Sequence, residues 1–364
     1  MALIPSTILT GFLGAGKTTL LNRILREDHG LRIAVIENEF GQENIDNEIL
    51  LQDDTEQIVE MNNGCICCTV RGDLIVALTE LARRREAGEI AFDRVVIETT
   101  GLANPGPVAQ TFFMDEEVAA HYLIDAVVTV VDARHAMDQL DEHEEAQRQV
   151  GFADKLLLSK TDLVDAPALA ALRARLKRIN PRAPISQSDF GSVPLAEVLD
   201  LRGFNLNDKL EIDPAFLTAD EAHDHAHHHA HDDDGEHEHV HTETCDHSND
   251  HHDHHDHNDH HHSHHSDDIA AFVFKSERPF DPARLDEFLG SLVNVFGPRM
   301  LRYKGVLLMD GADRKVVFQG VHQMMGSDLG AKWRDDEARG SKMVFIGKNL
   351  PKDVFIRGLE QCLV

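Results

Sequence analysis

The feature that most constrains this chain is the segment Gly11-Phe12-Leu13-Gly14-Ala15-Gly16-Lys17-Thr18, which matches the phosphate-loop pattern G-x-x-x-x-G-K-[ST] without a mismatch. The segment Ser6–Leu9 before it predicts a buried strand, and Thr19–Leu25 after it has the apolar spacing of a helix. Glycines let the backbone wrap closely around a phosphate, and the helix N-terminus adds its positive dipole end. A plain glycine-rich turn is the alternative interpretation, which the matching context disfavours.

The phosphate-loop pattern assigns a role to each of its positions. Lys17 reaches the outer phosphates as a catalytic cation, and the Thr18 hydroxyl ligates magnesium. The glycines and the backbone N–H groups around them surround the phosphates. The nucleotide-binding positions predicted here are Gly11, Gly14, Ala15, Gly16, Lys17, Thr18 and Thr19.

Downstream of the phosphate loop, another predicted strand ends in an acidic residue. The run Asp93–Glu98 predicts a strand that ends in an acid, and Gly101 follows three residues later. In phosphate-loop proteins such an acid holds magnesium, and such a glycine lets a backbone N–H approach the γ-phosphate. We therefore expect Glu98 to support magnesium and catalysis, and Gly101 to contact the nucleotide.

The nature of the base is indicated by Ser159-Lys160-Thr161-Asp162, at the end of the apolar run Lys155–Leu158. A carboxylate such as Asp162 accepts two hydrogen bonds from the N1–H and N2–H edge of guanine, which adenine does not offer. The aliphatic stem of Lys160 can lie over the base. The motif is weak alone, but its position downstream of a phosphate loop predicts GTP as the nucleotide.

Three of the five cysteines stand together at Cys65, Cys67 and Cys68, on an Asn-Gly turn before a helix predicted over Arg71–Arg85. Thiolates at this C-x-C-C spacing can converge on one soft cation, but a fourth ligand is needed for a tetrahedral site. The acidic loop that begins at Glu37 offers one such ligand. The alternative is a trio of small buried residues, since free cysteine often lies in a core.

The segment from Ala222 to Ser266 consists mostly of His, Asp and Glu, with 20 of the 25 histidines of the chain. It cannot bury a core, so we predict disorder without ligand. Imidazole beside carboxylate suits zinc, nickel, cobalt and copper. The alternatives are an acidic linker or a purification tag, although the interspersed acids argue against a tag. The acidic residues of this segment contribute much of the net charge of −29. A strongly negative net charge disfavours nucleic-acid partners.

The motifs GFLGAGKTTLL, ENEFG, NGCICC, ETTG with NPGP, and SKTD, in this order, resemble the CobW family of P-loop GTPases, and most of all its YjiA-like metal chaperones. The resemblance covers residues 4–215 and 269–362. It implies a Rossmann-like α/β GTPase domain, a smaller C-terminal α+β domain, and GTP-dependent metal delivery with C-x-C-C as the transferable site. Two positions depart from the family: Ser159 replaces the usual Asn, which predicts a weaker base pocket, and Gln42 replaces a Glu, which leaves Glu43 as a neighbouring ligand.

The resemblance and the composition together divide the chain into three parts. We predict a P-loop GTPase domain over residues 1–215, a disordered His-rich insert over 216–268, and a C-terminal domain over 269–364. Helices are expected at 165–179 and 194–200. In the C-terminal part we expect strands at 269–274, 306–309, 315–318 and 343–346, and helices at 282–296 and from Pro351. His322 is expected to be exposed, and a docking role for this domain competes with plain structural closure.

Together these observations predict a cytoplasmic GTPase that loads and delivers a divalent transition metal, zinc in the first place and cobalt or nickel as alternatives. Its partner would be a client metalloprotein docked through the C-terminal domain, with no membrane or nucleic-acid partner, and a homo-oligomer is compatible with the sequence. Residues 1–13 are expected to form the first strand and not a signal peptide. The competing interpretations are a metal buffer built on the His tract and cobalt delivery for cobalamin or nitrile hydratase-type enzymes.

Overall fold

The structure is a computed structural model that describes residues 3–37, 57–60, 69–204, 267–334 and 336–364. The cysteine turn at Cys65, Cys67 and Cys68, the positions Gln42 and Glu43, and the His tract lie outside these residues. No helix among those described combines the length and the hydrophobicity needed to cross a bilayer.

The N-terminal part is built on a seven-stranded sheet in which all the pairings are parallel. The spatial order is β3-β2-β4-β1-β5-β6-β7. β1 lies in the middle, and the strands on its two sides are added to the sheet in opposite directions. In such sheets ligands bind beyond the carboxyl ends of the strands. The strands are β1 (Ile4–Gly11), β2 (Ile33–Glu37), β3 (Gln57–Glu60), β4 (Arg94–Glu98), β5 (Tyr122–Asp132), β6 (Lys155–Ser159) and β7 (Ile185–Gln187).

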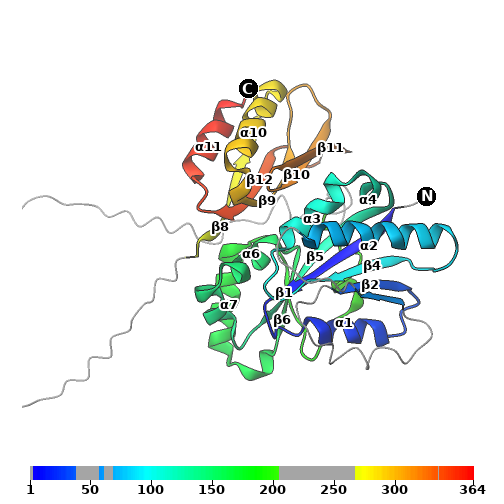
Figure 1. The fold of residues 1–364 in the computed structure, drawn as a ribbon. Helices are drawn as coiled ribbons and strands as arrows, with labels where there is room; N and C mark the ends of the chain where they lie inside the picture. The colour runs from blue at the N-terminus through cyan, green and yellow to red at the C-terminus, as the bar shows by residue number, and fades with distance from the viewer. Residues whose placement is uncertain (1–2, 38–56, 61–68, 205–266, 335) are drawn as a thin grey trace, which may run out of the picture. The chain divides into compact units, whose positions relative to one another are not determined.

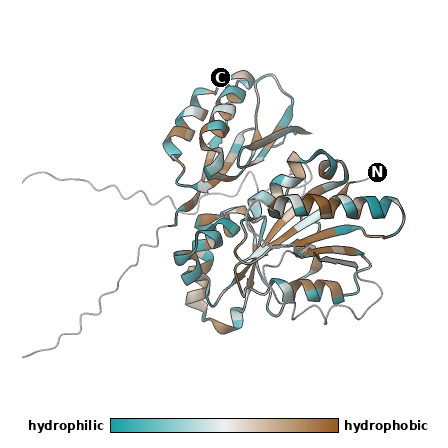
Figure 2. Ribbon diagram, viewed as in Figure 1, coloured by the Kyte–Doolittle hydropathy of each residue, from teal (hydrophilic) through white to brown (hydrophobic). Residues whose placement is uncertain are grey.

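Helices cover both faces of this sheet because successive strand residues point to opposite sides. Ile8 belongs to the core shared with α2, α3 and α6, whereas its neighbour Leu9 belongs to the core shared with α1. Figure 1 shows α1 and α2 on opposite sides of the strands, and Figure 2 shows that the central strands are largely hydrophobic. The helices are α1 (Lys17–Arg26), α2 (Thr69–Glu86), α3 (Pro105–Met114), α4 (Glu116–His121), α5 (Ala136–Glu142), α6 (Glu144–Phe152) and α7 (Ala166–Ile179).

The C-terminal part is an antiparallel sheet of strand order β11-β10-β9-β12-β8 with two helices. Aromatic residues form the core between the sheet and the helices; Phe345 and Phe355, for example, meet edge to face at 5.1 Å between ring centroids. The elements are β8 (Ile269–Ser276), α10 (Pro282–Phe296), β9 (Met300–Leu307), β10 (Arg314–Val321), β11 (Met324–Lys332), β12 (Ser341–Lys348) and α11 (Lys352–Gln361).

Helix α6 packs closely against the C-terminal sheet. A Cβ atom at Gly151 would lie 3.0 Å from Leu301 Cδ1 and 3.3 Å from Ile269 Cγ2, so a larger residue at this position would force the two apart. Ile269, Leu301 and Ile346 accordingly belong to the same hydrophobic core as residues of α2 and α3. The helix that carries this contact also reaches the nucleotide loops, as described below.

Two expected elements differ from the structure. The helix expected at 194–200 is only a 3₁₀ turn, Leu195–Glu197, because Val193, Val198 and Leu199 are all buried in the core shared with α1 and this packing replaces a regular helix. The strand expected at 306–309 begins earlier, as β9, and β11 was not expected at all. Most of β11 is exposed and rich in small and polar residues, so it lacks the alternation that announces a strand.

Candidate functional site

The phosphate loop joins β1 to α1 in the backbone conformation that its glycines permit. Gly14 and Gly16 have φ angles of 71° and 97°, in the left-handed region. Gly11 is required for a different reason, since a Cβ there would lie 2.3 Å from the carbonyl oxygen of Val130 on β5. Helix α1 begins at Lys17, which places its N-terminal N–H groups at the loop.

Lys17 lies inside this loop rather than in solvent. Its side chain is buried, and its ammonium donates hydrogen bonds to the carbonyl oxygens of Gly11 at 2.9 Å and Phe12 at 3.3 Å. These contacts hold the cation at the point where the loop curves. Thr19, on the first turn of α1, is exposed.

The second strand end comes next to the loop because β4 pairs with β1, with Glu98 opposite Leu9. Glu98 is buried, and its Oε1 accepts a 2.9 Å hydrogen bond from the Thr18 hydroxyl. Residues 80 positions apart in the chain thus present a hydroxyl and a carboxylate together. Hard oxygen ligands of this kind are those that magnesium prefers, so the pair fits the ion.

Gly101 lies directly against the phosphate loop. A Cβ at this position would be 2.6 Å from the backbone nitrogen of Leu13, so only glycine allows the approach. The amide of Gln149, on α6, donates hydrogen bonds of 3.0 Å to the carbonyls of both Gly101 and Ala103. Gln149 is 1 % exposed. It was not predicted from the sequence, because no motif identifies a functional glutamine within a helix.

The base motif follows β6 and is also tied to the phosphate loop. The Ser159 hydroxyl donates to the Ala15 carbonyl at 2.7 Å. Lys160 has a left-handed φ of 55°, and its ammonium contacts Asp132 Oδ2 at 2.7 Å. Asp162 is exposed on the short 3₁₀ turn Thr161–Leu163, where its carboxylate is open to solvent.

Two further acids shape this end of the site and were not singled out from the sequence. Burial opposes ionisation of Asp132, at the end of β5, but hydrogen bonds from Lys160 and His135 outweigh it and lower the pKa of Asp132. Asp189, just after β7, accepts hydrogen bonds from the backbone N–H of Thr161 at 2.9 Å and from its hydroxyl at 2.7 Å. Asp132 ends its strand and Asp189 follows the carboxyl end of another, and this position is the signal that could have identified them.

Of the residues predicted to hold the transition metal, only Glu37 lies among those described. It is half-buried at the end of β2, in register with Glu98 on the neighbouring strand. Within the described part of the chain, no three His, Cys, Asp or Glu side chains gather as a metal site.

The expectation that His322 is exposed is wrong. Its ring meets the ring of Phe152 edge to face at 5.4 Å, and a Cβ at Gly106 would lie 2.7 Å from His322 Nε2. Burial, together with the nearby positive charge of Arg148, lowers the pKa of His322 despite opposing contacts with the backbone of Gly297 and its neighbours. The sequence pattern failed here because the packing comes from α3 and α6, distant in the chain.

Comparison with known proteins shows which family models this chain matches. Residues 5–187 match the model of the CobW/HypB/UreG nucleotide-binding domain, and residues 269–363 match the cobalamin synthesis protein cobW C-terminal domain. The chain belongs to the CobW family. The resemblance inferred from the sequence motifs is therefore confirmed, as is the α/β P-loop domain followed by an antiparallel α+β domain.

Individual relatives of this CobW-family chain are similar over different lengths. It is 38% identical to the zinc chaperone YjiA of Escherichia coli over 352 residues, which is 96% of each chain. It is 42% identical to zinc-regulated GTPase metalloprotein activator 1 of Schizosaccharomyces pombe over 209 residues, or 55% of this chain and 50% of that protein. The crystal structure of the Zn(II)-bound YjiA GTPase from E. coli superimposes with a TM-score of 0.71 and 32% identity over all of both chains.

Proposed function

We propose that this chain is a GTP-hydrolysing metallochaperone that binds a divalent transition metal, zinc, and delivers it to client metalloproteins. The observation that carries the proposal is the contact between Thr18 and Glu98, which joins the phosphate loop to the next acidic strand end. Family membership supports it, and so does the 38% identity to a protein described as a zinc chaperone.

The phosphate loop would bind the triphosphate through its backbone N–H groups, with Gly101 beside it. Lys17 would stabilise the negative charge that develops on the transferring phosphoryl group, since a cation held in place before the reaction needs no reorganisation. The residues assigned to the nucleotide are Gly11, Gly14, Ala15, Gly16, Lys17, Thr18, Thr19, Gly101, Lys160 and Asp162.

Thr18 and Glu98 would hold the magnesium ion, which neutralises phosphate charge when it is bound. The two oxygens already lie 2.9 Å apart, so both can serve one ion after the hydroxyl gives up this hydrogen bond. Among the described residues we identify no glutamine that would orient the attacking water. We therefore expect slow hydrolysis without a partner.

Asp162 would select guanine, because it is exposed and free to accept the two base donors. Lys160 would lie along the base, and its ion pair with Asp132 fixes the direction of its stem. Ser159 supports this end of the site through the phosphate loop, so the loss of the usual Asn does not remove the link between base motif and loop.

The metal cargo would be held by Cys65, Cys67 and Cys68, with Glu37 or Glu43 as a further ligand. The register of β2 and β4 supports a connection, since Glu37 and Glu98 are direct neighbours across the sheet. A displacement of Glu98 would therefore act directly on Glu37, the first residue of the acidic loop, through the pairing of the two strands. GTP would order both segments, and GDP would relax them.

The client would be a metalloprotein, as the name of the S. pombe relative suggests for that protein. We place the chain in the cytoplasm, where thiols stay reduced and can bind metal. We assign residues 1–215 to the GTPase domain, 216–268 to a disordered metal-capturing insert, and 269–364 to the C-terminal domain.

The catalytic part of the proposal is tested by Lys17→Ala, which should abolish GTP turnover while the protein stays folded by circular dichroism. Lys332→Ala is the matched control, because that lysine is on β11 with a side chain 73% exposed. Normal turnover in Lys17→Ala would mean that the loop is only structural.

A metal buffer remains the second candidate, favoured by the 20 histidines of residues 222–266. Deletion of these residues separates the two. A buffer would lose nearly all its zinc capacity, whereas a chaperone would keep one tight site and its GTP turnover.

A further inference from the structure

A cavity of about 450 Å³ lies between the end of α3, Phe204, and one end of the C-terminal sheet. It is separate from the nucleotide site. This volume is within the range of sites that bind small ligands or one to two large side chains. Its walls are formed by Phe113, Met114, Phe204, Arg302, Gln319, Gly320, Val321, Gln323, Met324, Met325 and Gly326.

The mouth of the cavity is apolar and accessible. Phe113, Met114 and Met325 are 47%, 56% and 37% exposed, and the ring of Phe113 packs against Phe204 with 5.8 Å between ring centroids. Two of them are methionines, whose unbranched side chains adapt to the shapes of different ligands.

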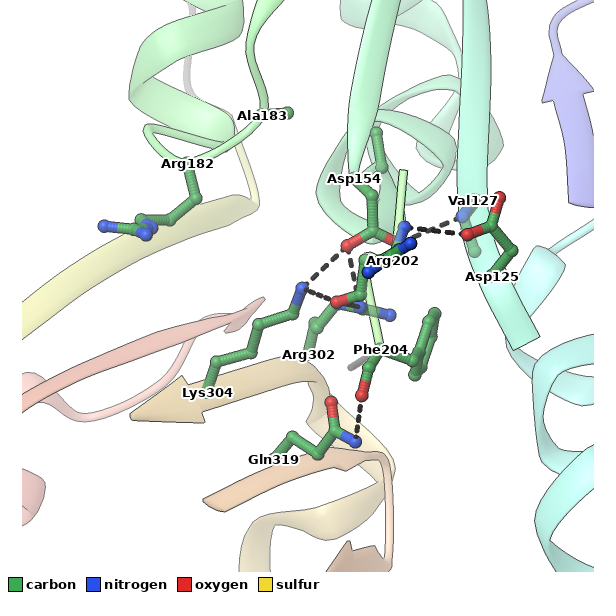
Figure 3. A network of polar contacts seen from close by, with 12 residues as sticks. Asp125, Val127, Asp154, Arg182, Ala183, Arg202, Phe204, Arg302, Lys304 and Gln319 are labelled. Carbon is green, nitrogen blue, oxygen red and sulfur yellow. Dashed lines mark hydrogen bonds and ion pairs between the residues drawn. The ribbon is translucent and has the colours of Figure 1, made fainter. Parts of the chain in front are cut away.

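The wall of the cavity contains a buried cation with unused hydrogen-bond donors. Arg302 is 3% exposed, its guanidinium stacks on the ring of Phe204 at 3.6 Å, and its Nη2 donates to Asp154 at 2.8 Å (Figure 3). Both its Nε and its Nη1 are buried, and no described residue accepts a hydrogen bond from either atom. Such donors are costly to leave unsatisfied, and a carboxylate is the strongest acceptor for them.

Asp154 is not in a position to satisfy these remaining donors. One of its oxygens already accepts hydrogen bonds from Arg302 and from Lys304, the latter at 2.7 Å, and the other accepts the backbone N–H of Val127 at 2.9 Å. The Nε and Nη1 donors of Arg302 therefore need an acceptor other than Asp154.

A complementary unused acceptor lies beside it. Gln319 donates from Nε2 to the Phe204 carbonyl at 2.7 Å, while its buried Oε1 accepts no hydrogen bond from any described residue. An acceptor next to a cation matches a peptide, which carries backbone N–H groups as well as carboxylates.

We propose that this cavity binds an extended peptide segment of a partner protein, with a large apolar side chain between the methionines, a carboxylate on Arg302 and a backbone N–H on Gln319 Oε1. The edge position of β11 supports a peptide: among the described strands it pairs only with β10, and Met324, Met325 and Gly326 of β11 line the cavity. Extended peptides commonly add to such edges. The inference rests on the proposed function in one respect, that the partner is the metalloprotein client.

The test uses the full chain with ¹³C-methyl-labelled methionine, so that Met114, Met324 and Met325 report on the cavity by NMR. The probes are three short peptides: acetyl-Ala-Leu with a free C-terminal carboxylate, acetyl-Ala-Leu-Asp amide with a side-chain carboxylate, and acetyl-Ala-Leu-Asn amide as the neutral match. At least one carboxylate peptide should shift these methyl signals and bind about tenfold or more tightly than the neutral peptide, since a hydrogen bond to a charged group contributes roughly 1.5–3 kcal/mol. The two carboxylate arms distinguish a chain terminus from an acidic side chain.

Met325→Asp should weaken the binding of the carboxylate peptides about tenfold by repulsion and loss of apolar contact. Leu329→Asp is the matched control, since Leu329 is 56% exposed on the same strand but does not line the cavity, and it should leave binding unchanged. Because Met325 is on the exposed rim, this variant avoids the risk that removal of Arg302 unfolds the protein.

No methyl shift with any peptide, equal binding of the neutral peptide, or equal effects of the two substitutions would overturn the proposal. GTP turnover measured on the same samples keeps the two ideas apart. Turnover without peptide binding would contradict only the peptide site, whereas peptide binding without turnover would contradict only the proposed GTPase.

Discussion

The hydroxyl of Ser159 donates a 2.7 Å hydrogen bond to the carbonyl of Ala15. This bond joins the base motif after β6 to the phosphate loop after β1, although the residues are 144 positions apart. Ser159 therefore couples the two halves of the nucleotide site through its hydroxyl.

The first prediction follows from this bond. Ser159→Ala should lower the free energy of unfolding by about 1–3 kcal/mol, because the buried Ala15 carbonyl would lose its donor. It should also weaken GTP binding, since the loop would no longer be held in position. Urea denaturation and nucleotide titration measure both effects. Ser327→Ala, on the exposed β11, is the control and should stay within about 0.5 kcal/mol of the parent.

Asp162 provides the second prediction. Asp162→Asn should weaken GTP by roughly 10- to 100-fold, because two hydrogen bonds to a charged acceptor become weaker or reverse. It should admit xanthosine nucleotides, whose base offers an acceptor at the corresponding position. Because Asp162 is exposed, folding should not change. Asp353→Asn on α11 is the control, and equal affinity of the parent for ATP and GTP would contradict the assignment.

The third prediction concerns coupling between nucleotide and metal. Zinc should bind more tightly with a non-hydrolysable GTP analogue than with GDP, by about 1–3 kcal/mol, the usual range of allosteric coupling. The reason is that thiolates must be held together around the ion, and the ordered loops next to Glu37 and Glu98 would do this. A competition titration on protein lacking residues 222–266 measures the difference without interference from weak histidine sites.

Cys67→Ser is the matched variant for this titration. It should remove the tight zinc site and leave GTP binding in zinc-free buffer unchanged. Identical zinc affinity in the two nucleotide states of the parent would refute nucleotide-driven delivery and favour the buffer.

His322 leads to a prediction about pH. Its pKa in the folded protein lies below the ordinary value of 6.5, so on acidification the unfolded chain takes up this proton first. The contribution to stability is therefore complete above 6.5 and is lost as the pH falls below it. His322→Asn should flatten this dependence, and Asn tolerates the positive φ of 52° at this position. Urea midpoints of parent and variant across this range test it, and parallel curves would contradict it.

The parts of the site that were predictable from the sequence are those built from contiguous residues. The loop from Gly11 to Thr18 could be recognised because its chemistry depends on local spacing, and Glu98 because it ends an apolar strand before a glycine. Gln149 and Asp189 could not be recognised in this way. The Gln149 amide donates to carbonyls 48 and 46 positions away, and Asp189 follows a strand end without a motif.

The sequence by itself determined the strand, loop and helix of the phosphate loop and the family, because both are expressed in short patterns of residue type. Only the tertiary structure decided that the Ser159 hydroxyl would bond to the phosphate loop, that His322 would pack half-buried against Phe152, and that Arg302 would line a cavity with two donors that no described residue accepts. The physical reason is that burial and hydrogen-bond satisfaction depend on which distant segments come into contact. The contact of His322 with Phe152, for example, depends on the packing of α6 against the C-terminal sheet, which no local pattern records.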